Sequence, residues 1–276
     1  PLSHPQFFPP QVTLAHQKMV SQLTVFDGIA CISAYTQEQF LTYLREHFGE
    51  SHQSDGLSVG QFQLGSFIEN SGPEPERALT SIESRKIEIT KLLSVGTIEP
   101  RKGYDFLLDV FEELEAAEAP FALSIIGRAG WRVLPRIQRR SVDKTLKRLS
   151  ALRDEGRLVW LDSANDERLR KEYEQCDVVI LSSWGEGFGL PLIEALALDK
   201  PVIARDIPAF REIGGDRVAF FDTMVPEELA AQLPALVKEA GEARANSCAH
   251  HDTSWHESAE QLINFALQAR KNSIGD

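Results

Sequence analysis

Residues 177–204 read DVVILSSWGEGFGLPLIEALALDKPVIA, in which two apolar runs flank a glycine-rich turn and a third apolar stretch. The outer runs, DVVILS and PVIA, are rich in Val and Ile, as buried parallel strands are. The middle stretch, from about residue 190 to residue 198, is apolar on nearly every side, which is typical of a buried helix. A strand, a turn, a helix and a second strand form one βαβ unit, so this stretch predicts a parallel sheet covered by helices.

Short runs rich in Val, Ile and Leu alternate with amphipathic stretches from residue 91 onward. Helices are expected at 106–114 and 169–174. Strands are expected at six places: LLSVG (92–96), ALSIIG (122–127), RLVWL (157–161), DVVILS (177–182), PVIA (201–204) and VAFF (218–221). Six strands joined by crossovers predict an α/β fold, a doubly wound parallel sheet of the Rossmann-like kind.

The first 90 residues carry the same alternation more faintly, with helices expected near 12–24 and 36–47 and strands at 28–33 and 57–64. We expect four parts: the end of a first Rossmann-like domain (1–68), a Gly-, Pro- and Glu-rich linker (69–90), a complete second domain (91–253) and a C-terminal helix that packs back on the first domain (254–276). Because the chain opens on Pro1, we also expect further residues upstream.

Composition excludes several classes of protein. The 276 residues are 42% hydrophobic and contain no apolar run long enough to cross a bilayer. Three widely spaced cysteines do not suggest a disulfide framework, so a reducing, cytoplasmic location is expected. A net charge of -12 argues against nucleic-acid binding.

One stretch departs from this acidic balance, since nine cations and a single acid lie between Arg128 and Arg153. The simpler interpretation is a solvated helix face. The alternative is contact with anionic lipid at the inner face of a membrane or with a phosphorylated acceptor.

The glycine-rich turn that leads to residue 190 has the features of an anion site. Parallel sheets bind ligands at the carboxyl ends of their strands, and Gly187 and Gly189 let backbone N–H groups approach a ligand at the start of a helix. Glu194, inside that apolar helix, needs hydrogen-bond donors, and a ribose diol supplies two. Glu186, just before the turn, can serve a second polyol.

Cations for a phosphate group are available after the first strand of the same domain, where SVGTIEPRKGYD carries Arg101 and Lys102. Both loops lie at one edge of the sheet, so the two cations can face the glycine-rich turn. The alternative for all four charged residues is an ordinary role as exposed surface charges or helix caps. Two acids for sugar hydroxyls, two cations for phosphate and the glycine-rich turn together predict a site for a nucleotide sugar.

EGFGLPLIEA, with its two glutamates separated by seven residues, VGTIEPRKG, IIGRAGW and PVIARDIPAFREIGG resemble the motifs of the retaining GT-B glycosyltransferases. This large family includes bacterial mannosyl- and glucosyltransferases. The resemblance runs from about residue 92 to residue 222, and more weakly over the first 66 residues. It implies two Rossmann-like domains with the active site between them, so that 1–68 is acceptor-side and 91–253 binds the donor.

The resemblance also implies roles for individual residues. Lys102 and Arg101 would neutralise the donor diphosphate, Glu186 would contact the transferred sugar, and Glu194 would bind the ribose hydroxyls. The remaining donor-binding residues would be Gly187, Phe188, Gly189 and Leu190 at the turn, with Arg128 bordering the base or diphosphate. Thr97 stands where many members have an arginine.

The activity that the resemblance implies is retaining, metal-independent transfer of a hexose from a nucleotide diphosphate sugar to a saccharide or lipid-linked acceptor in polysaccharide assembly. No D-x-D sequence occurs, and no cofactor is expected beyond the donor substrate. RKG, GW and DIPAFRE favour mannose, hence GDP-mannose over UDP-sugars. The family's acceptor loop and catalytic-site histidine would lie upstream of Pro1, so we expect this chain alone to hold a donor without transferring it.

Other functions stay open. The alternative from a different class is a non-catalytic, regulatory module that binds a nucleotide sugar. An epimerase or a phosphorylase would share the architecture. An NAD enzyme is disfavoured because the turn lacks the G-x-G-x-x-G spacing. CAHHDTSWH (248–256) invites a zinc site, but without a second ligand cluster it is interpreted as a loop.

Overall fold

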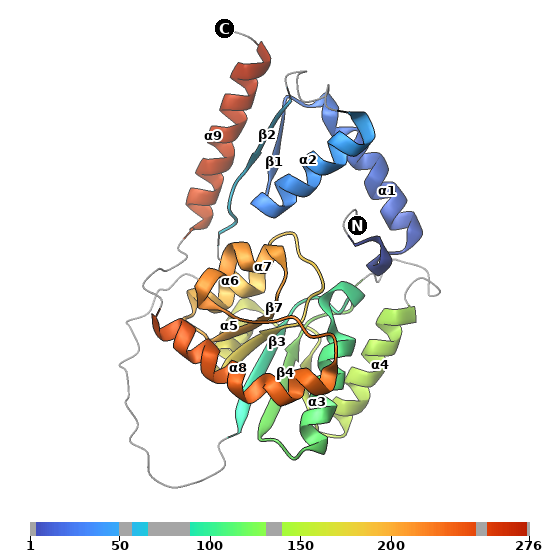
Figure 1. The fold of residues 1–276 in the computed structure, drawn as a ribbon, viewed down its shortest axis with the longest axis vertical. Helices are drawn as coiled ribbons and strands as arrows, with labels where there is room; N and C mark the ends of the chain where they lie inside the picture. Colours follow the sequence, from blue (N-terminus) through green and yellow to red (C-terminus); the bar gives the residue numbers. More distant parts are fainter. Residues whose placement is uncertain (1–3, 50–56, 66–88, 131–139, 247–252, 275–276) are drawn as a thin grey trace.

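The computed structural model describes residues 4–49, 57–65, 89–130, 140–246 and 253–274. Its larger part contains a six-stranded sheet, with every neighbouring pair of strands parallel. The strands lie where the sequence predicted them: β3 (Thr90–Val95), β4 (Phe121–Ile126), β5 (Val159–Leu161), β6 (Val178–Leu181), β7 (Val202–Arg205) and β8 (Ala219–Phe221). The predicted doubly wound α/β fold is confirmed (Figure 1).

The order of the strands locates the ligand edge. They run β5-β4-β3-β6-β7-β8, so the chain reverses its direction of growth between β3 and β6. These two strands are direct neighbours, with Leu92 opposite Val178 and Leu93 opposite Val179. In such sheets the crevice at the carboxyl ends of the two central strands binds the ligand. The loops that follow β3 and β6 therefore begin side by side.

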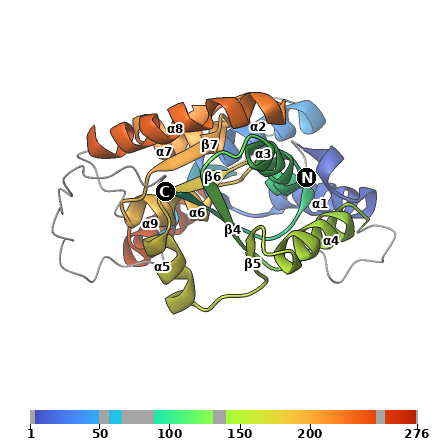
Figure 2. The same cartoon turned by 90° about the horizontal axis from the view of Figure 1, so that it is seen from below.

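Helices cover both faces of this sheet (Figures 1 and 2). Alternate residues of each strand point to opposite faces, as Leu92 and Leu93 do, because the pleat has a period of two. One core lies under α3 (Tyr104–Ala116), α4 (Arg140–Asp154) and α8 (Pro226–Asn246), and the other under α5 (Asp166–Gln175), α6 (Leu190–Ala197) and α7 (Pro208–Gly214). α7 and α8 were not predicted from the sequence.

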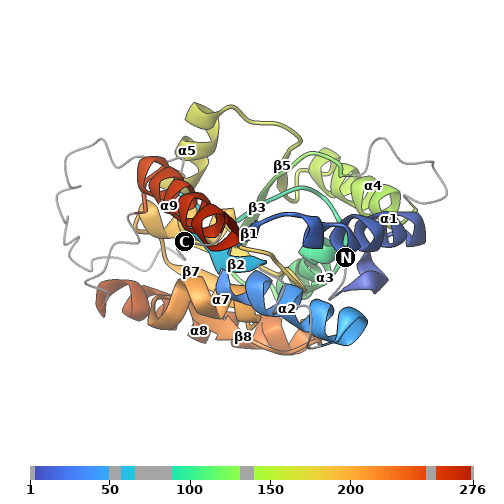
Figure 3. The same ribbon diagram turned by 90° about the horizontal axis from the view of Figure 1, so that it is seen from above.

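The smaller part of the structure consists of α1 (Pro10–Ser21), β1 (Gly28–Cys31), α2 (Ala34–Phe48) and β2 (Ser58–Gln61). β1 and β2 form a parallel pair. The C-terminal helix α9 (Trp255–Ile274) lies against this pair so closely that a Cβ atom at Gly60 would come within 2.4 Å of the Phe265 ring (Figures 1 and 3). The predicted linker, 69–90, falls almost entirely outside the described residues.

Four short 3-10 helices complete the described structure: η1 (Pro5–Phe7), η2 (Leu23–Val25), η4 (Pro100–Lys102) and η6 (Gly215–Arg217). The loop after β3 contains η4, and the loop after β6 contains the glycine turn. Among the described residues, no helix combines the length and the apolar character that a membrane span requires.

Candidate functional site

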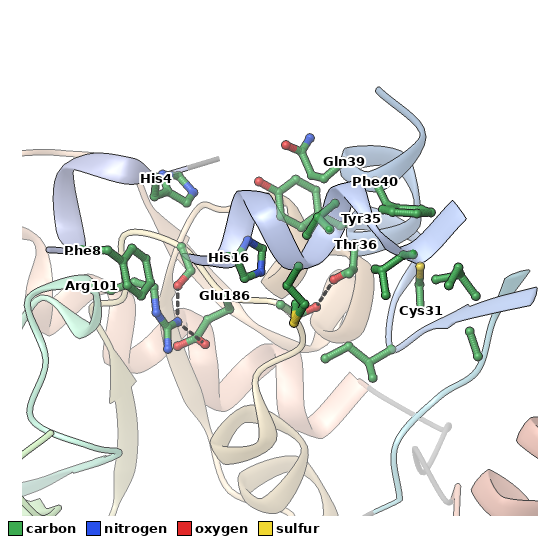
Figure 4. Close-up of a pocket in the computed structure, with 18 residues that line it drawn as sticks. His4, Phe8, His16, Cys31, Tyr35, Thr36, Gln39, Phe40, Arg101 and Glu186 are labelled. Atoms are coloured by element: carbon green, nitrogen blue, oxygen red, sulfur yellow. Dashed lines mark hydrogen bonds and ion pairs between the residues drawn. The ribbon is translucent and has the colours of Figure 1, made fainter. Parts of the chain in front are cut away.

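The loops after β3 and β6 meet through three charged side chains, which we call the Glu186 cluster: Arg101, Lys102 and Glu186. One carboxylate oxygen of Glu186 lies 2.6 Å from Lys102 Nζ, and the other lies 2.6 Å from Arg101 Nη1. Ser183 Oγ donates a third hydrogen bond to the carboxylate, at 2.8 Å. Figure 4 shows the Arg101 guanidinium pointing at Glu186. The structure therefore brings together the three residues that the sequence placed at one edge of the sheet.

Glu186 is ionised in this setting. Its side chain is only 7% exposed, and burial by itself would raise the pKa of the carboxyl group. The charges of Lys102 and Arg101, and their hydrogen bonds, act in the opposite direction and hold the pKa below its ordinary value. That the two cations pair with Glu186 was not predicted, since both were assigned to a phosphate.

The backbone around the cluster is fixed by close contacts between the two loops. Gly103 adopts the left-handed conformation (φ 71°), and a Cβ atom there would clash with the carbonyl oxygen of Ser182. Ser182 Oγ in turn donates to the Lys102 carbonyl at 3.0 Å, and Trp184 N–H donates to the Arg101 carbonyl at 2.8 Å. The positions of Arg101 and Lys102 are thus set by the end of β6.

Glu194 lies in α6 and is 9% exposed. It accepts a 2.8 Å hydrogen bond from the hydroxyl of Tyr173, a fully buried residue of α5. Burial raises the pKa of Glu194, and the Tyr173 hydrogen bond and the charge of Lys102 only partly oppose this rise. Burial likewise raises the pKa of Tyr173 well above its usual range. Tyr173 was not predicted as part of the site, because nothing in the pattern of α5 marks it as a partner of Glu194.

The glycine turn offers backbone donors. Gly189 caps α6 with φ 109°, and a Cβ atom there would lie 2.7 Å from the Phe210 ring. Phe188 is buried and Leu190 begins the helix. Within the described part of the chain, the N–H groups of Gly187, Phe188 and Gly189 donate no hydrogen bond to another residue. Unpaired N–H groups at a helix start favour an anion.

The structure does not place the Arg128 side chain in the cluster. Arg128 is exposed, while its carbonyl oxygen accepts a hydrogen bond from Ile98 N–H. Trp131, three residues further along the chain, lies outside the described residues. Of the basic stretch, Arg148 is 23% exposed and pairs with Asp109 and Glu112 of α3, so this residue joins α4 to α3 and is not part of a solvated face.

A buried arginine at the end of β7 was also missed. Arg205 is 3% exposed and its guanidinium carbon lies 3.7 Å from the centre of the Trp184 ring, with Phe106 and Phe221 also in contact. Burial lowers its pKa to about 10. Its Nε donates to the Ser182 carbonyl. Arg205 thus supports the segment that leads into Gly185 and Glu186. A cation at the end of an otherwise apolar strand is the signal that could have found it.

A cavity of about 510 Å³ opens beside the cluster (Figure 4). Arg101, Glu186 and Gly187 form one wall, and α1, β1 and α2 form the other. His4 and His16, which had no predicted role, also line it, and burial lowers the pKa of both. Lys102 and Glu194 are not part of its lining. Lys102 is joined to the cavity by its ion pair with Glu186.

In the stretch 248–256, which the sequence analysis interprets as a loop, Cys248, His250 and His251 lie outside the described residues. His256 is described, and its Nε2 lies 3.3 Å from a carboxylate oxygen of Glu260. Among the residues that the structure covers, no group of three or more His, Cys, Asp or Glu side chains could hold a metal ion.

Comparison with known proteins adds to this geometry. Residues 81–250 match the family described as glycosyl transferases group 1. The chain is 32% identical over 243 residues to the serotype-specific mannosyltransferase WbdA of Escherichia coli, covering 86% of this chain and 28% of that protein. It is 29% identical over 204 residues to the D-inositol 3-phosphate glycosyltransferase of Rhodococcus jostii (strain RHA1), covering 71% of this chain and 43% of that one. The chain therefore spans less than half the length of these relatives.

Solved structures show the fold. A UDP-forming α,α-trehalose-phosphate synthase of Burkholderia xenovorans superposes with a TM-score of 0.68 at 13% identity, over 96% of this chain and 67% of that one. The corresponding synthase of Burkholderia multivorans gives a TM-score of 0.65 at 13% identity, over 97% and 64%. The predicted GT-B architecture is confirmed by this likeness, which at such identities speaks for the fold alone.

Proposed function

Because this chain belongs to the group 1 glycosyltransferases, we propose that it binds the donor of a retaining, metal-independent enzyme. The enzyme transfers a hexose, mannose in the first place, from a nucleoside diphosphate sugar to a saccharide or lipid-linked acceptor. The observation that carries this proposal is the Glu186 cluster beside the glycine turn. Two cations, and a row of N–H groups that donate to no described residue, suit a diphosphate at this sheet edge.

In this proposal, Arg101 and Lys102 stabilise the charge that grows on the diphosphate as it leaves. Glu186 already holds both cations, so it orients them and can turn one oxygen to a sugar hydroxyl. The acceptor hydroxyl attacks the anomeric carbon on the face from which the diphosphate departs. Its proton passes to an oxygen of that diphosphate, so the bond to the donor breaks as the new glycosidic bond forms and the configuration is retained.

Glu194 has a separate task in the proposal. Its carboxylate is nearly buried and has one described donor, the Tyr173 hydroxyl, which leaves acceptor capacity for the two hydroxyls of a ribose. Glu194 stands on α6, the helix that starts at the glycine turn, so we assign it to the same donor as Glu186. A nucleotide sugar extending along the sheet edge would place its ribose at Glu194 and its hexose at Glu186.

The preference for mannose is supported by the similarity to the mannosyltransferase WbdA. Neither the acceptor nor the linkage is inferred from this similarity, because the chain covers only 28% of that relative. Polysaccharide assembly, a cytoplasmic location and peripheral membrane contact through the basic stretch 128–153 stay predictions.

The test is a panel of nucleotide sugars in thermal unfolding. A ligand that binds only the folded state raises the melting temperature, and at equal concentration the tighter ligand raises it more. We expect GDP-mannose to raise it more than UDP-glucose or ADP-glucose. If none of the three changes it, the assignment of a donor site is wrong. Release of mannose from GDP-mannose, to water or to an added acceptor, separates catalysis from binding.

A further inference from the structure

The start of helix α2, in the smaller part of the structure, contacts the glycine turn of the larger part directly. Ser33 Oγ lies 2.6 Å from the carbonyl oxygen of Gly187, and Thr36 Oγ1 lies 2.9 Å from the same oxygen. Ser33 is 2% exposed, so its contact is shielded from water. More than 150 residues separate these hydroxyls from the carbonyl in sequence. Ser33 Oγ also lies 2.8 Å from Thr36 Oγ1. Because each hydroxyl has one proton, Ser33 donates either to Thr36 or to the carbonyl, and the three groups form one hydrogen-bonded cluster between the two parts.

The carbonyl that they hold belongs to a peptide unit with a free donor. Gly187 C=O and Phe188 N–H share one planar, trans peptide, so they point in opposite directions and turn together. The glycine on one side of this peptide leaves it more rotational freedom than another residue would. Hydrogen bonds on the carbonyl therefore fix the direction of the Phe188 N–H, which donates to no other described residue.

A second contact seats α2 against the larger part. The carboxylate of Glu212, on α7, accepts hydrogen bonds from Ala34 N–H at 2.7 Å and from Tyr35 N–H at 2.9 Å. The first N–H groups of a helix have no partner within the helix, and its positive end favours an acid. Ser33 and Thr36 flank Ala34 and Tyr35 in the sequence. The contact with Glu212 therefore holds both hydroxyls within reach of the Gly187 carbonyl.

We propose that Ser33 and Thr36 are positioning residues, which hold the Gly187–Phe188 peptide so that the Phe188 N–H donates to the diphosphate of the donor. The inference rests on the proposed function and goes beyond it, because it makes donor affinity depend on hydroxyls of the acceptor-side part. Separation of the two parts would release the peptide and loosen the donor.

The test is calorimetric titration with GDP and with UDP of the wild-type chain and of Thr36→Val, which keeps the shape of the side chain and removes the hydroxyl. Since one hydrogen bond contributes about 0.5–1.5 kcal/mol, the dissociation constant should rise about two- to tenfold. Ser33→Ala should give a similar rise, and the double variant a larger one. Ser33 also caps α2 through Thr36 N–H, so its variant is checked for unchanged unfolding first.

Two controls separate positioning from general stability. Thr36→Ser restores a hydroxyl and should recover most of the wild-type affinity. Thr42→Val makes the same substitution on the same helix, where the threonine contacts Arg45, and should leave the affinity unchanged. If the wild-type chain binds a nucleoside diphosphate and Thr36→Val and the double variant bind it equally well, the positioning role is refuted and the donor site stands. If the wild type binds neither GDP nor UDP, the proposed function fails and the inference fails with it.

Discussion

Replacement of Glu186 by glutamine should destabilise the protein yet tighten its hold on a free nucleoside diphosphate. The carboxylate is 7% exposed and pairs with Lys102 and Arg101, whose side chains are 13% and 21% exposed. Glutamine keeps the size of the side chain but removes its charge. Lys102 then loses the carboxylate that it pairs with, Arg101 keeps only the longer ion pair with Glu99 at 3.8 Å, and both cations become available to phosphate.

Both effects can be scaled from the structure. Removal of one partner from a buried ion pair costs about 3–5 kcal/mol, and the partial exposure of both cations brings our expectation to about 2–3 kcal/mol at pH 7. For binding, two unit charges about 5 Å apart interact by roughly 3 kcal/mol at an effective dielectric of 20. Salt screens part of this repulsion between carboxylate and diphosphate, so we expect GDP to bind about tenfold more tightly.

The pH dependence follows from the lowered pKa of Glu186. A carboxyl group whose pKa falls on folding stabilises the protein above its unfolded pKa, about 4.3 for glutamate, and loses this effect as the pH falls through the folded value. The stability difference between wild type and Glu186→Gln should therefore be complete at pH 7 and shrink in acid below about pH 4.

The assay is chemical unfolding of both proteins from pH 3 to pH 8, followed by titration of each with GDP. Ser183→Ala is a suitable control, because it removes a neutral hydrogen bond to the same carboxylate and leaves its charge in place. Equal stability of wild type and Glu186→Gln at pH 7, or weaker binding of GDP by the variant, would refute the reasoning.

The remaining predictions concern Glu194, Tyr173 and the need for a metal. Glu194→Gln should raise stability at pH 7.5 more than at pH 5, because burial raises the Glu194 pKa and the ionised form is the costly one; an equal effect at both pH values would contradict this. The same variant should bind GDP-mannose more weakly. Tyr173→Phe should lower stability by about 1–3 kcal/mol in urea unfolding, since the buried carboxylate loses its described donor, and a neutral result would mean that another group replaces it. Addition of EDTA should leave donor binding unchanged in calorimetry, whereas a loss of affinity would show that a metal takes part.

Much of the fold could be predicted from the sequence, because the strands are short, continuous apolar runs that are easy to recognise. Runs such as DVVILS and PVIA are buried on both faces and are therefore apolar throughout, and the glycines between them mark the turn. The rule that parallel sheets bind ligands at the carboxyl ends of their strands then placed Arg101, Lys102 and Glu186 at one edge. Helices α7 and α8 were harder, since α7 is only seven residues long and α8 carries Pro234 in its interior.

The missing parts of the site have a different physical origin. Tyr173, Ser33 and His4 reach the site only through tertiary packing, and no spacing in the sequence encodes which distant group they meet. The pairing of Glu186 with both cations was missed for a related reason. Sequence places charges at an edge, but the partner each one takes depends on side-chain directions and burial, which only coordinates supply.

The most direct test of the donor site is a calorimetric titration of GDP into the wild-type chain and into Lys102→Ala. We expect saturable binding at one site in the wild type and at least a tenfold loss of affinity in the variant, because a charged partner of the diphosphate contributes about 1.5–3 kcal/mol. Unchanged affinity in Lys102→Ala would contradict the claim that this edge of the sheet holds the diphosphate.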